Sequence, residues 1–185
     1  MALAAGLRDC GADDLAAVHA IYRREVLEGT ASFELEPPDL ATLTERWQAI
    51  RAAGLPYLVA ELDGRVAGFA SAGIYRPRPA YRFAVEDSVY IAPWARRRGL
   101  GRLLLDAVIA RATAAGRRQM IAIIGDSAHL ASIALHRQAG FRMVGTLEDV
   151  GWKFGRWLDT VIMQRALGAG AAAPPAEPPG GPAPP

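Results

Sequence analysis

The chain has 185 residues, of which 21 are basic and 19 acidic, and hydrophobic residues make up 51% of it. This is the composition of a globular protein of one domain, so a wholly disordered chain and a fibrous repeat are excluded. The net charge of +2 gives no reason to expect a nucleic acid as partner, and the single cysteine, Cys10, favours a reducing, cytoplasmic setting.

The first half of the chain predicts two helices followed by a pair of strands. Apolar residues recur at helical spacing over about residues 13–27, and a second helix is expected over about 39–53. Residues 57–62 and 65–74 are rich in β-branched and aromatic residues. Asp63-Gly64 between them is a strong signal for a two-residue hairpin.

The second half predicts alternating strands and helices. The segment 77–83, with two prolines, is expected to be a loop. Strands are expected at 85–92, 120–124, 141–150 and 157–164, and helices at 101–115 and 129–139. A strand meander followed by a crossover predicts an α/β (α+β) fold in which a mixed sheet is flanked by helices.

The C-terminal segment differs in composition from the rest. Residues 168–185 are rich in Pro, Gly and Ala and carry one charge, Glu177, so we expect a disordered tail behind a single domain over 1–167. Arg8 and Asp9 interrupt the N-terminal apolar run before it reaches the length of a signal peptide, and no apolar run is long enough to span a bilayer. Neither export nor a membrane is therefore expected.

Between the strand at 85–92 and the helix at 101–115 lies the segment Arg96-Arg-Arg-Gly-Leu-Gly-Arg102. Glycines allow close approach to a ligand, and the first amides of a helix lack acceptors inside it, so such a turn suits a phosphate or pyrophosphate. It has no Gly-Lys-Ser/Thr end, and Leu104 stands where a dinucleotide fingerprint needs a third glycine. On these residues alone, a basic surface turn remains an alternative.

The spacing Arg96-x-x-Gly99-x-Gly101 resembles the pyrophosphate-binding motif of the GNAT superfamily of acyl-CoA-dependent N-acetyltransferases. Further segments resemble its phosphinothricin/methionine sulfoximine acetyltransferase branch, over nearly all of residues 7–167. They include Gly29–Glu34, Tyr75–Pro77, Tyr81-Arg82, Val85–Tyr90, Ala131–His136 and Gly151–Asp159. The resemblance implies the GNAT fold, with a mixed, mostly antiparallel central sheet, and acetyl-CoA as cosubstrate.

Two residues are candidates for proton transfer. Strand alternation places Glu86, Ser88 and Tyr90 on one face and Val85, Asp87, Val89 and Ile91 on the other. The resemblance carries the general base of the family onto Glu86, which would act directly or through a water. It also implies that His136 lies near the CoA sulfur, where an imidazole could protonate the departing thiolate. A solvated glutamate and a locally bonded histidine remain the alternatives.

The acceptor site is expected around the loop that precedes Glu86. Arg76 and Arg82 could hold the carboxylate and the tetrahedral oxyanion of an amino-acid analogue through forked hydrogen bonds, or they could be ordinary surface residues. The resemblance implies acceptor-binding positions at Phe33, Tyr75, Arg76, Pro77, Arg82, Val85, Glu86, Asp87 and Lys153. The cluster around Lys153 could equally line a dimer interface or form a hairpin turn with a cation–π pair.

The cosubstrate site is expected to combine the basic turn with the strand before it. Main-chain groups of Ser88–Tyr90 would pair with the pantetheine arm and face the thioester oxygen. The implied cosubstrate-binding residues are Ser88, Val89, Tyr90, Arg96, Arg97, Arg98, Gly99, Leu100, Gly101, Arg102, His129 and Ser132. His129 departs from the branch, which usually has an asparagine there.

The sequence therefore predicts an acetyl-CoA-dependent enzyme that acetylates the α-amino group of a small amino acid, in a ternary complex and as a homodimer. Three arginines and no acid in 75–82 favour an anionic acceptor over a polyamine. Another amine, such as a protein N-terminus, and a non-catalytic acyl-CoA sensor stay open as alternatives. No cluster of side chains has metal-ligand spacing, so no metal is expected.

Overall fold

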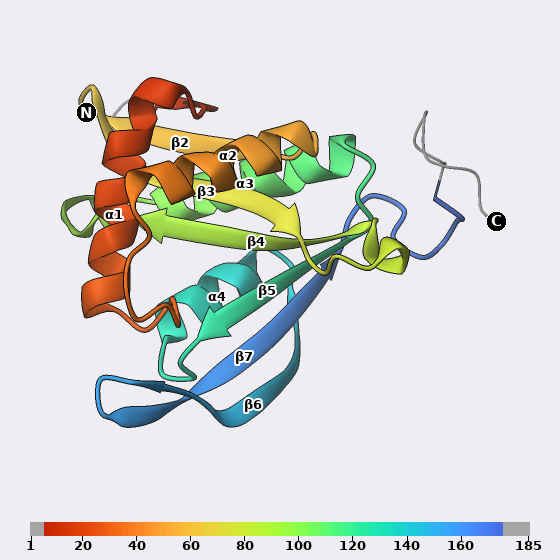
Figure 1. Ribbon diagram of the computed structural model, residues 1–185. Coiled ribbons are helices and arrows are strands. Elements are labelled where there is room, and N and C mark those ends of the chain that lie inside the picture. The colour runs from red at the N-terminus through yellow and green to blue at the C-terminus, as the bar shows by residue number, and fades with distance from the viewer. Residues whose placement is uncertain (1–5, 176–185) are drawn as a thin grey trace.

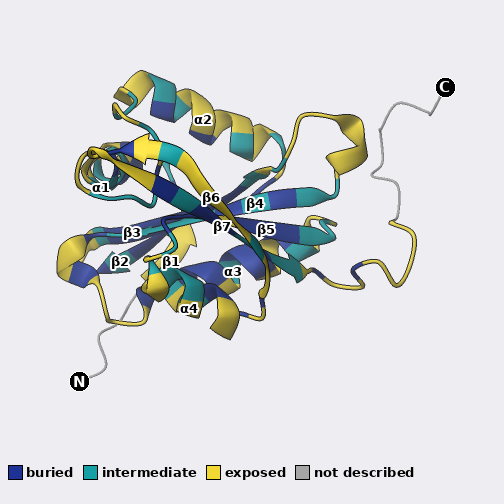
Figure 2. Cartoon of the chain, turned by 90° about the horizontal axis from the view of Figure 1, so that it is seen from below, coloured by how far each residue is buried: buried dark blue, intermediate teal, exposed yellow. Residues whose placement is uncertain are grey.

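The computed structural model describes residues 6–175 and consists of one sheet with helices on both faces (Figures 1 and 2). The strands are β1 (Gly6–Asp9), β2 (Tyr57–Leu62), β3 (Arg65–Ile74), β4 (Ala84–Ile91), β5 (Gln119–Gly125), β6 (Arg142–Lys153) and β7 (Arg156–Ala166). The helices are α1 (Leu15–Glu28), α2 (Leu40–Ala52), α3 (Leu100–Ala114) and α4 (Leu130–Gln138).

The seven strands lie in the order β1-β2-β3-β4-β5-β7-β6. Every neighbouring pair is antiparallel except β4 and β5, which are parallel. Asp63 and Gly64 both have positive φ, 52° and 73°, and form the predicted two-residue turn between β2 and β3. The mixed, mostly antiparallel sheet flanked by helices is confirmed.

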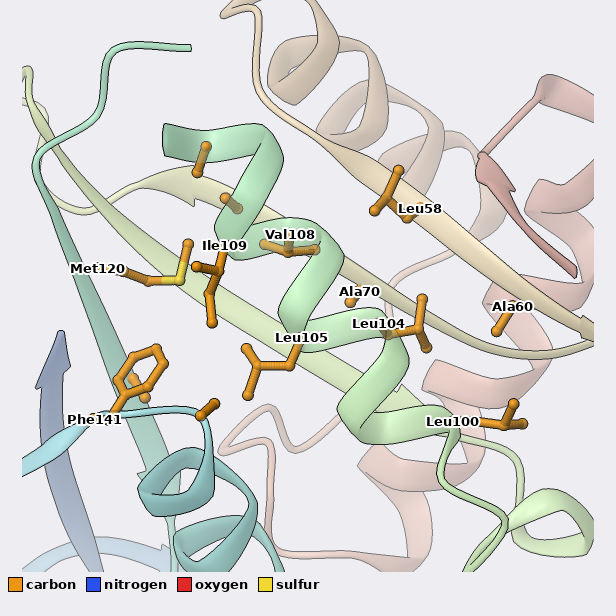
Figure 3. Packing of buried hydrophobic residues seen from close by; sticks show 14 of the residues in the cluster. Leu58, Ala60, Ala70, Leu100, Leu104, Leu105, Val108, Ile109, Met120 and Phe141 are labelled. Atoms are coloured by element: carbon orange, nitrogen blue, oxygen red, sulfur yellow. The ribbon is translucent and has the colours of Figure 1, made fainter. Parts of the chain in front are cut away.

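Alternation along β2 assigns its side chains to two different packing layers. Leu58 and Ala60 belong to the larger core under α3, whereas Tyr57 and Val59 belong to a smaller one under α1 and α2. Figure 3 shows the leucines of α3 pointing toward the buried side chains of the sheet. The sheet is thus covered by α1 and α2 on one face and by α3 and α4 on the other (Figure 2).

Two features differ from the sequence-based expectation. The sequence did not predict β1, because all four residues of this short edge strand are exposed and carry no alternating pattern. The closing hairpin is longer than expected, since β6 continues to Lys153 and the chain turns at Phe154 and Gly155, both with positive φ. Most of β6 is exposed, so periodicity gave little indication of where this strand ends.

The predicted tail falls partly within the described residues. The chain after Leu167 forms turns, in which the amide of Gly170 donates to the Leu167 carbonyl and that of Ala172 to the Ala169 carbonyl. Arg118 donates to the Pro174 carbonyl. Residues 176–185 lie outside the described part of the chain, so the domain boundary at 167 stays a prediction.

The sheet forks between its two parallel strands. β4 and β5 pair from Ala84 opposite Gln119 to Asp87 opposite Ala122, and beyond this point the strands diverge (Figure 1). The rest of β4 stays paired with β3, up to Ile91 opposite Gly68. One main-chain edge of residues 88–91 is thereby released from the sheet, and we call this opening the fork.

Candidate active site

Two adjoining cavities of about 480 Å³ each open at the fork. The first, which we call the fork cavity, is lined by α1, the loop 31–34, β4, β5, α4 and Thr160 of β7. The second, the turn cavity, lies between the end of β4, the basic turn and α4. Both cavities are lined by Ala31, Val89, Tyr90, His129 and Ser132. A ligand could therefore pass from one cavity into the other along the released edge of β4.

The basic turn gives the turn cavity an anion-binding character. Arg97 and Gly99 have positive φ, 61° and 80°, and the chain bends there into α3, whose first amides have no acceptor within the helix. Arg96, Arg97 and Arg102 line this cavity, together with Gly99, Leu100 and Gly101. Backbone amides and guanidinium groups thus surround one space, as a pyrophosphate requires.

Not all of the expected arginines are free for a ligand. Arg98 is exposed and does not line the turn cavity. Arg96 pairs with Glu25 at 3.1 Å, and Arg102 pairs with Asp106 at 2.5 Å. These carboxylates hold the two guanidinium groups at the rim.

Glu86 lies at the base of the fork and lines the fork cavity. Burial raises the pKa of its carboxyl, the negative charge of Asp87 raises it further, and the positive charge of Arg76 acts in the opposite direction. A carboxylate whose pKa is raised is a better proton acceptor for an ammonium group than a solvated one. The geometry thus suits Glu86 to base catalysis.

His136 is buried and does not lie on the helix surface. Its Nδ1 lies 2.7 Å from the Ser132 carbonyl oxygen and its Nε2 lies 2.9 Å from Oδ2 of Asp87. Burial disfavours the charged ring, but the hydrogen bonds to Asp87 and Ser132 outweigh it and raise the pKa of His136. Both ring nitrogens therefore have protein partners, and donation of a proton to a thiolate would require one of these bonds to break.

Lys153 supports the fork cavity from behind and does not line it. It is 4% exposed, and its Nζ donates to the carbonyls of Gly29 and Ser32 at 2.9 and 2.7 Å. The Ser32 hydroxyl in turn lies 3.1 Å from that of Tyr22. The lysine of the late hairpin thus anchors the loop that carries Phe33 into the cavity.

The arginine loop lies apart from the fork cavity. Tyr75, Arg76, Pro77, Arg78 and Tyr81 line a separate hollow of about 320 Å³. The Arg82 guanidinium lies over the ring of Phe83, 4.7 Å from its centroid, and Val85 is part of the core. The structure therefore brings Phe33, Glu86 and Asp87 together but leaves Tyr75, Pro77, Arg82 and Val85 outside this cavity.

The sequence analysis missed several residues of the fork cavity, namely Tyr22, Ala31, Glu34, Ile123, Gly125 and Thr160. Gly125 has a steric role, because a Cβ there would lie 2.2 Å from the Thr30 carbonyl oxygen and 2.9 Å from Phe33. A glycine at the end of an apolar strand was a usable signal for such a close approach. Thr160 had none, since only the pairing of β7 with β5 brings it to the fork.

Two features are absent from the described part of the chain. Among residues 6–175, no group of three or more His, Cys, Asp or Glu side chains is arranged to hold a metal ion. Within the same range, no helix is both long and apolar enough to cross a membrane.

A sheet forked at a pair of parallel strands, with an anion-binding turn beside the fork, is the architecture of an acyl-CoA-dependent N-acyltransferase. Residues 16–141 match the Acetyltransferase (GNAT) family, and the chain belongs to this family. It is an acetyl-CoA-dependent N-acetyltransferase, as its relatives indicate.

Three relatives are similar over most of their length. The chain is 56% identical over 158 residues to a phosphinothricin N-acetyltransferase of Alcaligenes faecalis, covering 85% of this chain and 80% of that protein. It is 44% identical to an L-methionine sulfoximine/L-methionine sulfone acetyltransferase of Pseudomonas aeruginosa, covering 93% and 100%. The crystal structure of a phosphinothricin acetyltransferase from Sinorhizobium meliloti with acetyl-CoA superposes with a TM-score of 0.92 at 49% identity, covering 96% and 95%.

Proposed function

We propose that the protein acetylates the α-amino group of a small amino acid or analogue, of the phosphinothricin, methionine sulfoximine or methionine sulfone type. The observation that carries this proposal is the position of Glu86, a half-buried carboxylate that lines the fork cavity, beside a second cavity that could hold the other substrate. The names of the relatives support the acceptor class. Transfer is direct, within a ternary complex.

Acetyl-CoA occupies the turn cavity in this proposal. Its pyrophosphate lies at the start of α3 beside Arg96, Arg97 and Arg102, where backbone amides and guanidinium groups converge. Its pantetheine arm follows the released edge of Ser88–Tyr90, whose main-chain groups are no longer paired with β5. His129 and Ser132 line the passage between the cavities and flank the same arm.

The acceptor amine occupies the fork cavity. Glu86 takes the proton of the ammonium group, directly or through a water, and the free amine attacks the thioester carbonyl. Main-chain amides at the released edge of β4 stabilise the oxyanion that forms. Collapse of the tetrahedral intermediate breaks the C–S bond and releases CoA. His136 remains a candidate donor for the thiolate, once its bond to Asp87 opens.

Arg76 and Arg82 are proposed to recognise the anionic groups of the acceptor. Arg76 is close enough to Glu86 for its charge to act on that carboxyl, which supports a place near the bound amine. Arg82 lies farther away, over Phe83, and has to turn toward the ligand. We also propose a cytoplasmic homodimer, in which a second copy of the chain packs on the exposed apolar residues of the hairpin β6–β7.

The test measures CoA-thiol release from acetyl-CoA against L-phosphinothricin, L-methionine sulfoximine, L-methionine sulfone, L-methionine, spermidine and a peptide with a free N-terminus. We expect turnover on the first three. Glu86→Gln should lower kcat at least about a hundredfold and leave acetyl-CoA affinity in place, because it removes the base and not the cosubstrate site.

Arg76→Ala and Arg82→Ala should raise the acceptor KM by about tenfold, since each removes a charge-assisted contact. Arg111→Ala is the matched control, because this exposed arginine pairs with Asp9 of the edge strand β1 and lines none of the three hollows. Turnover on spermidine or the peptide alone would overturn the acceptor assignment. Equal losses in Arg111→Ala would show that removal of any surface arginine has the same effect.

A further inference from the structure

A buried pair of ionisable side chains lies directly beside the proposed base. The side chains of His136 and Asp87 are 5% and 2% exposed, and their contact joins α4 to β4. Asp87 follows Glu86 in the chain and is the last residue of β4 that is paired with β5. The pair thus lies at the point where the sheet forks.

The hydrogen bonds of His136 determine how many protons the pair holds. The carbonyl oxygen of Ser132 only accepts, so Nδ1 must donate to it. Nε2 lies 2.9 Å from Oδ2 of Asp87. Without a proton between them, the lone pairs of these two atoms would repel each other in a buried site. A second proton must therefore lie between Nε2 and Asp87. The raised pKa of His136 places this proton on the ring, which makes the pair an imidazolium and a carboxylate with no net charge.

Apart from His136, few groups near Asp87 could balance its negative charge. Its Oδ1 is buried and has no hydrogen-bond partner among residues 6–175. The positive charge of Arg76 acts on the neighbouring Glu86, and Arg76 is exposed. The other titratable groups that line the fork cavity are Tyr22 of α1, Glu34 of the loop 31–34, Tyr90 of β4 and His129 of α4. Glu34 is paired with Arg46, so His136 is the counter-charge in direct contact with Asp87.

We propose that Asp87 and His136 hold one proton between them, and that this proton keeps the pair electrically neutral so that Glu86 stays ionised as the base at neutral pH. In this role, which is separate from any donation of a proton by His136 to the thiolate, the two are positioning residues that act through Glu86. The inference rests on the proposed function for the role of Glu86, whereas the held proton follows from the hydrogen bonds alone. The direction of the effect is set by the negative charge of Asp87, which favours the protonated form of Glu86 when it is not balanced.

The held proton is tested in the unliganded protein, without any assay of activity. Ring ¹⁵N spectra are recorded between about pH 6 and about pH 8, where ordinary histidines titrate. The chain has three histidines, and the signals of His136 are identified by their loss in His136→Gln. We expect both ring nitrogens of His136 to stay protonated over this range, and Asp87→Asn to lose the Nε2 proton. An unprotonated Nε2 at about pH 7 in the unaltered protein would overturn the proposal.

The effect on Glu86 is tested in the pH profile of kcat/KM, whose acid limb reports ionisation of the base. His136→Gln keeps a hydrogen-bond donor toward Asp87 but carries no charge, so the negative charge of Asp87 is no longer balanced and raises the pKa of Glu86. The acid limb should therefore move to higher pH. Activity at about pH 6 should fall several-fold more than activity at about pH 8. In Asp87→Asn the imidazole of His136 gives up its second proton, so the pair remains neutral. The acid limb of the kcat/KM profile should then stay in place. The double variant should return the limb to its original position.

The double variant separates the electrostatic role from a merely structural one. Loss of packing would lower kcat/KM by the same factor at all pH values, so it would not move the acid limb in either variant. A limb that does not move in His136→Gln, or does not return in the double variant, would overturn the proposal. If His136→Gln does not fold, the proposal is tested by the other two measurements. The acid limb of Asp87→Asn should be unchanged, and the ¹⁵N spectra should show a protonated Nε2. If the unaltered protein has no turnover with any acceptor, the proposed function fails, and the spectra still test the held proton.

Discussion

At the scale of single residues, two glycines determine where the loop 31–34 lies, which we call the acceptor loop because it carries Phe33 into the fork cavity. A Cβ on Gly151 would come within 2.3 Å of Cε2 of Phe33, and one on Gly125 would come within 2.9 Å of the same ring. The ring of Phe33 therefore occupies space that any side chain on β5 or β6 at these positions would fill. Lys153 fixes the same loop through its main chain. The position of Phe33 in the fork cavity thus depends on residues that themselves touch no ligand.

Gly151→Ala should therefore displace the ring of Phe33 and lower kcat/KM for the acceptor by about tenfold, because misplacing a substrate-positioning group by about 1 Å is costly. The ring can rotate away, so the melting temperature and the acetyl-CoA affinity should change little. Gly145→Ala in the same strand is the control, since nothing lies within 4 Å of its Cβ position. Steady-state kinetics with each substrate varied in turn compare kcat/KM in the two variants. Equal effects of Gly151→Ala and Gly145→Ala would contradict the prediction.

At the scale of elements, the start of α3 carries the proposed cosubstrate site. The helix is held in place by its apolar face, on which Leu100, Leu104 and Leu105 are buried (Figure 3). Its first turn follows Gly99, whose left-handed backbone disfavours side chains and directs the amides of the turn to one side. Gly116 has a similar φ of 76° just after the other end of the helix, away from both cavities.

Gly99→Ala and Gly116→Ala should each cost about 1 kcal/mol of stability, because both place a Cβ on a left-handed residue. Only Gly99→Ala should raise the KM for acetyl-CoA, by about tenfold, since relief of the strain would turn its amides away from the pyrophosphate. Thermal unfolding measures the loss of stability in both variants. Initial rates at varied acetyl-CoA concentration measure the change in KM, which is expected in Gly99→Ala alone. A similar rise in KM in Gly116→Ala would contradict the assignment of the turn.

At the scale of the whole molecule, β6 and β7 present an apolar surface at the edge of the sheet. Its exposed residues are Met143, Val144, Leu147, Val150, Trp152, Phe154 and Trp157. Seven exposed apolar side chains on one hairpin favour a surface that binds a partner. Because the hairpin also supplies Lys153 and Gly151 to the acceptor loop, a second copy on this surface would stabilise the fork cavity.

Val150→Asp should weaken the proposed dimer at least about tenfold, because it places a charge in an apolar interface. Sedimentation velocity at several concentrations measures this effect, with kcat/KM for the acceptor followed in parallel. Leu35→Asp is the matched control, since Leu35 is also exposed, at 67% against 54% for Val150, but does not belong to the hairpin. A monomer in the unaltered protein, or equal weakening in both variants, would contradict a dimer built on this surface.

Local patterns in the sequence were enough to predict all α-helices and strands except β1 and to indicate an anion-binding turn before α3. Helical spacing, the Asp63-Gly64 turn and the spacing from Arg96 to Gly101 are local, so each could be recognised within a short segment. The strand bounds at 57–62 and 65–74 agree with β2 and β3, because these strands alternate between two buried layers. The acetyltransferase class followed from the resemblance that these segments carry.

The assembly of the site depends on contacts between residues that are far apart in the chain. The contact of Asp87 with His136 joins residues 49 positions apart, and that of Lys153 with Ser32 joins residues 121 apart, so neither leaves a local pattern. Sequence alone assigned both Lys153 and Arg82 to the acceptor, yet Lys153 anchors a loop and Arg82 lies over Phe83. The fork itself arises where β4 and β5 stop pairing, and side-chain periodicity carries no information about where two distant strands diverge.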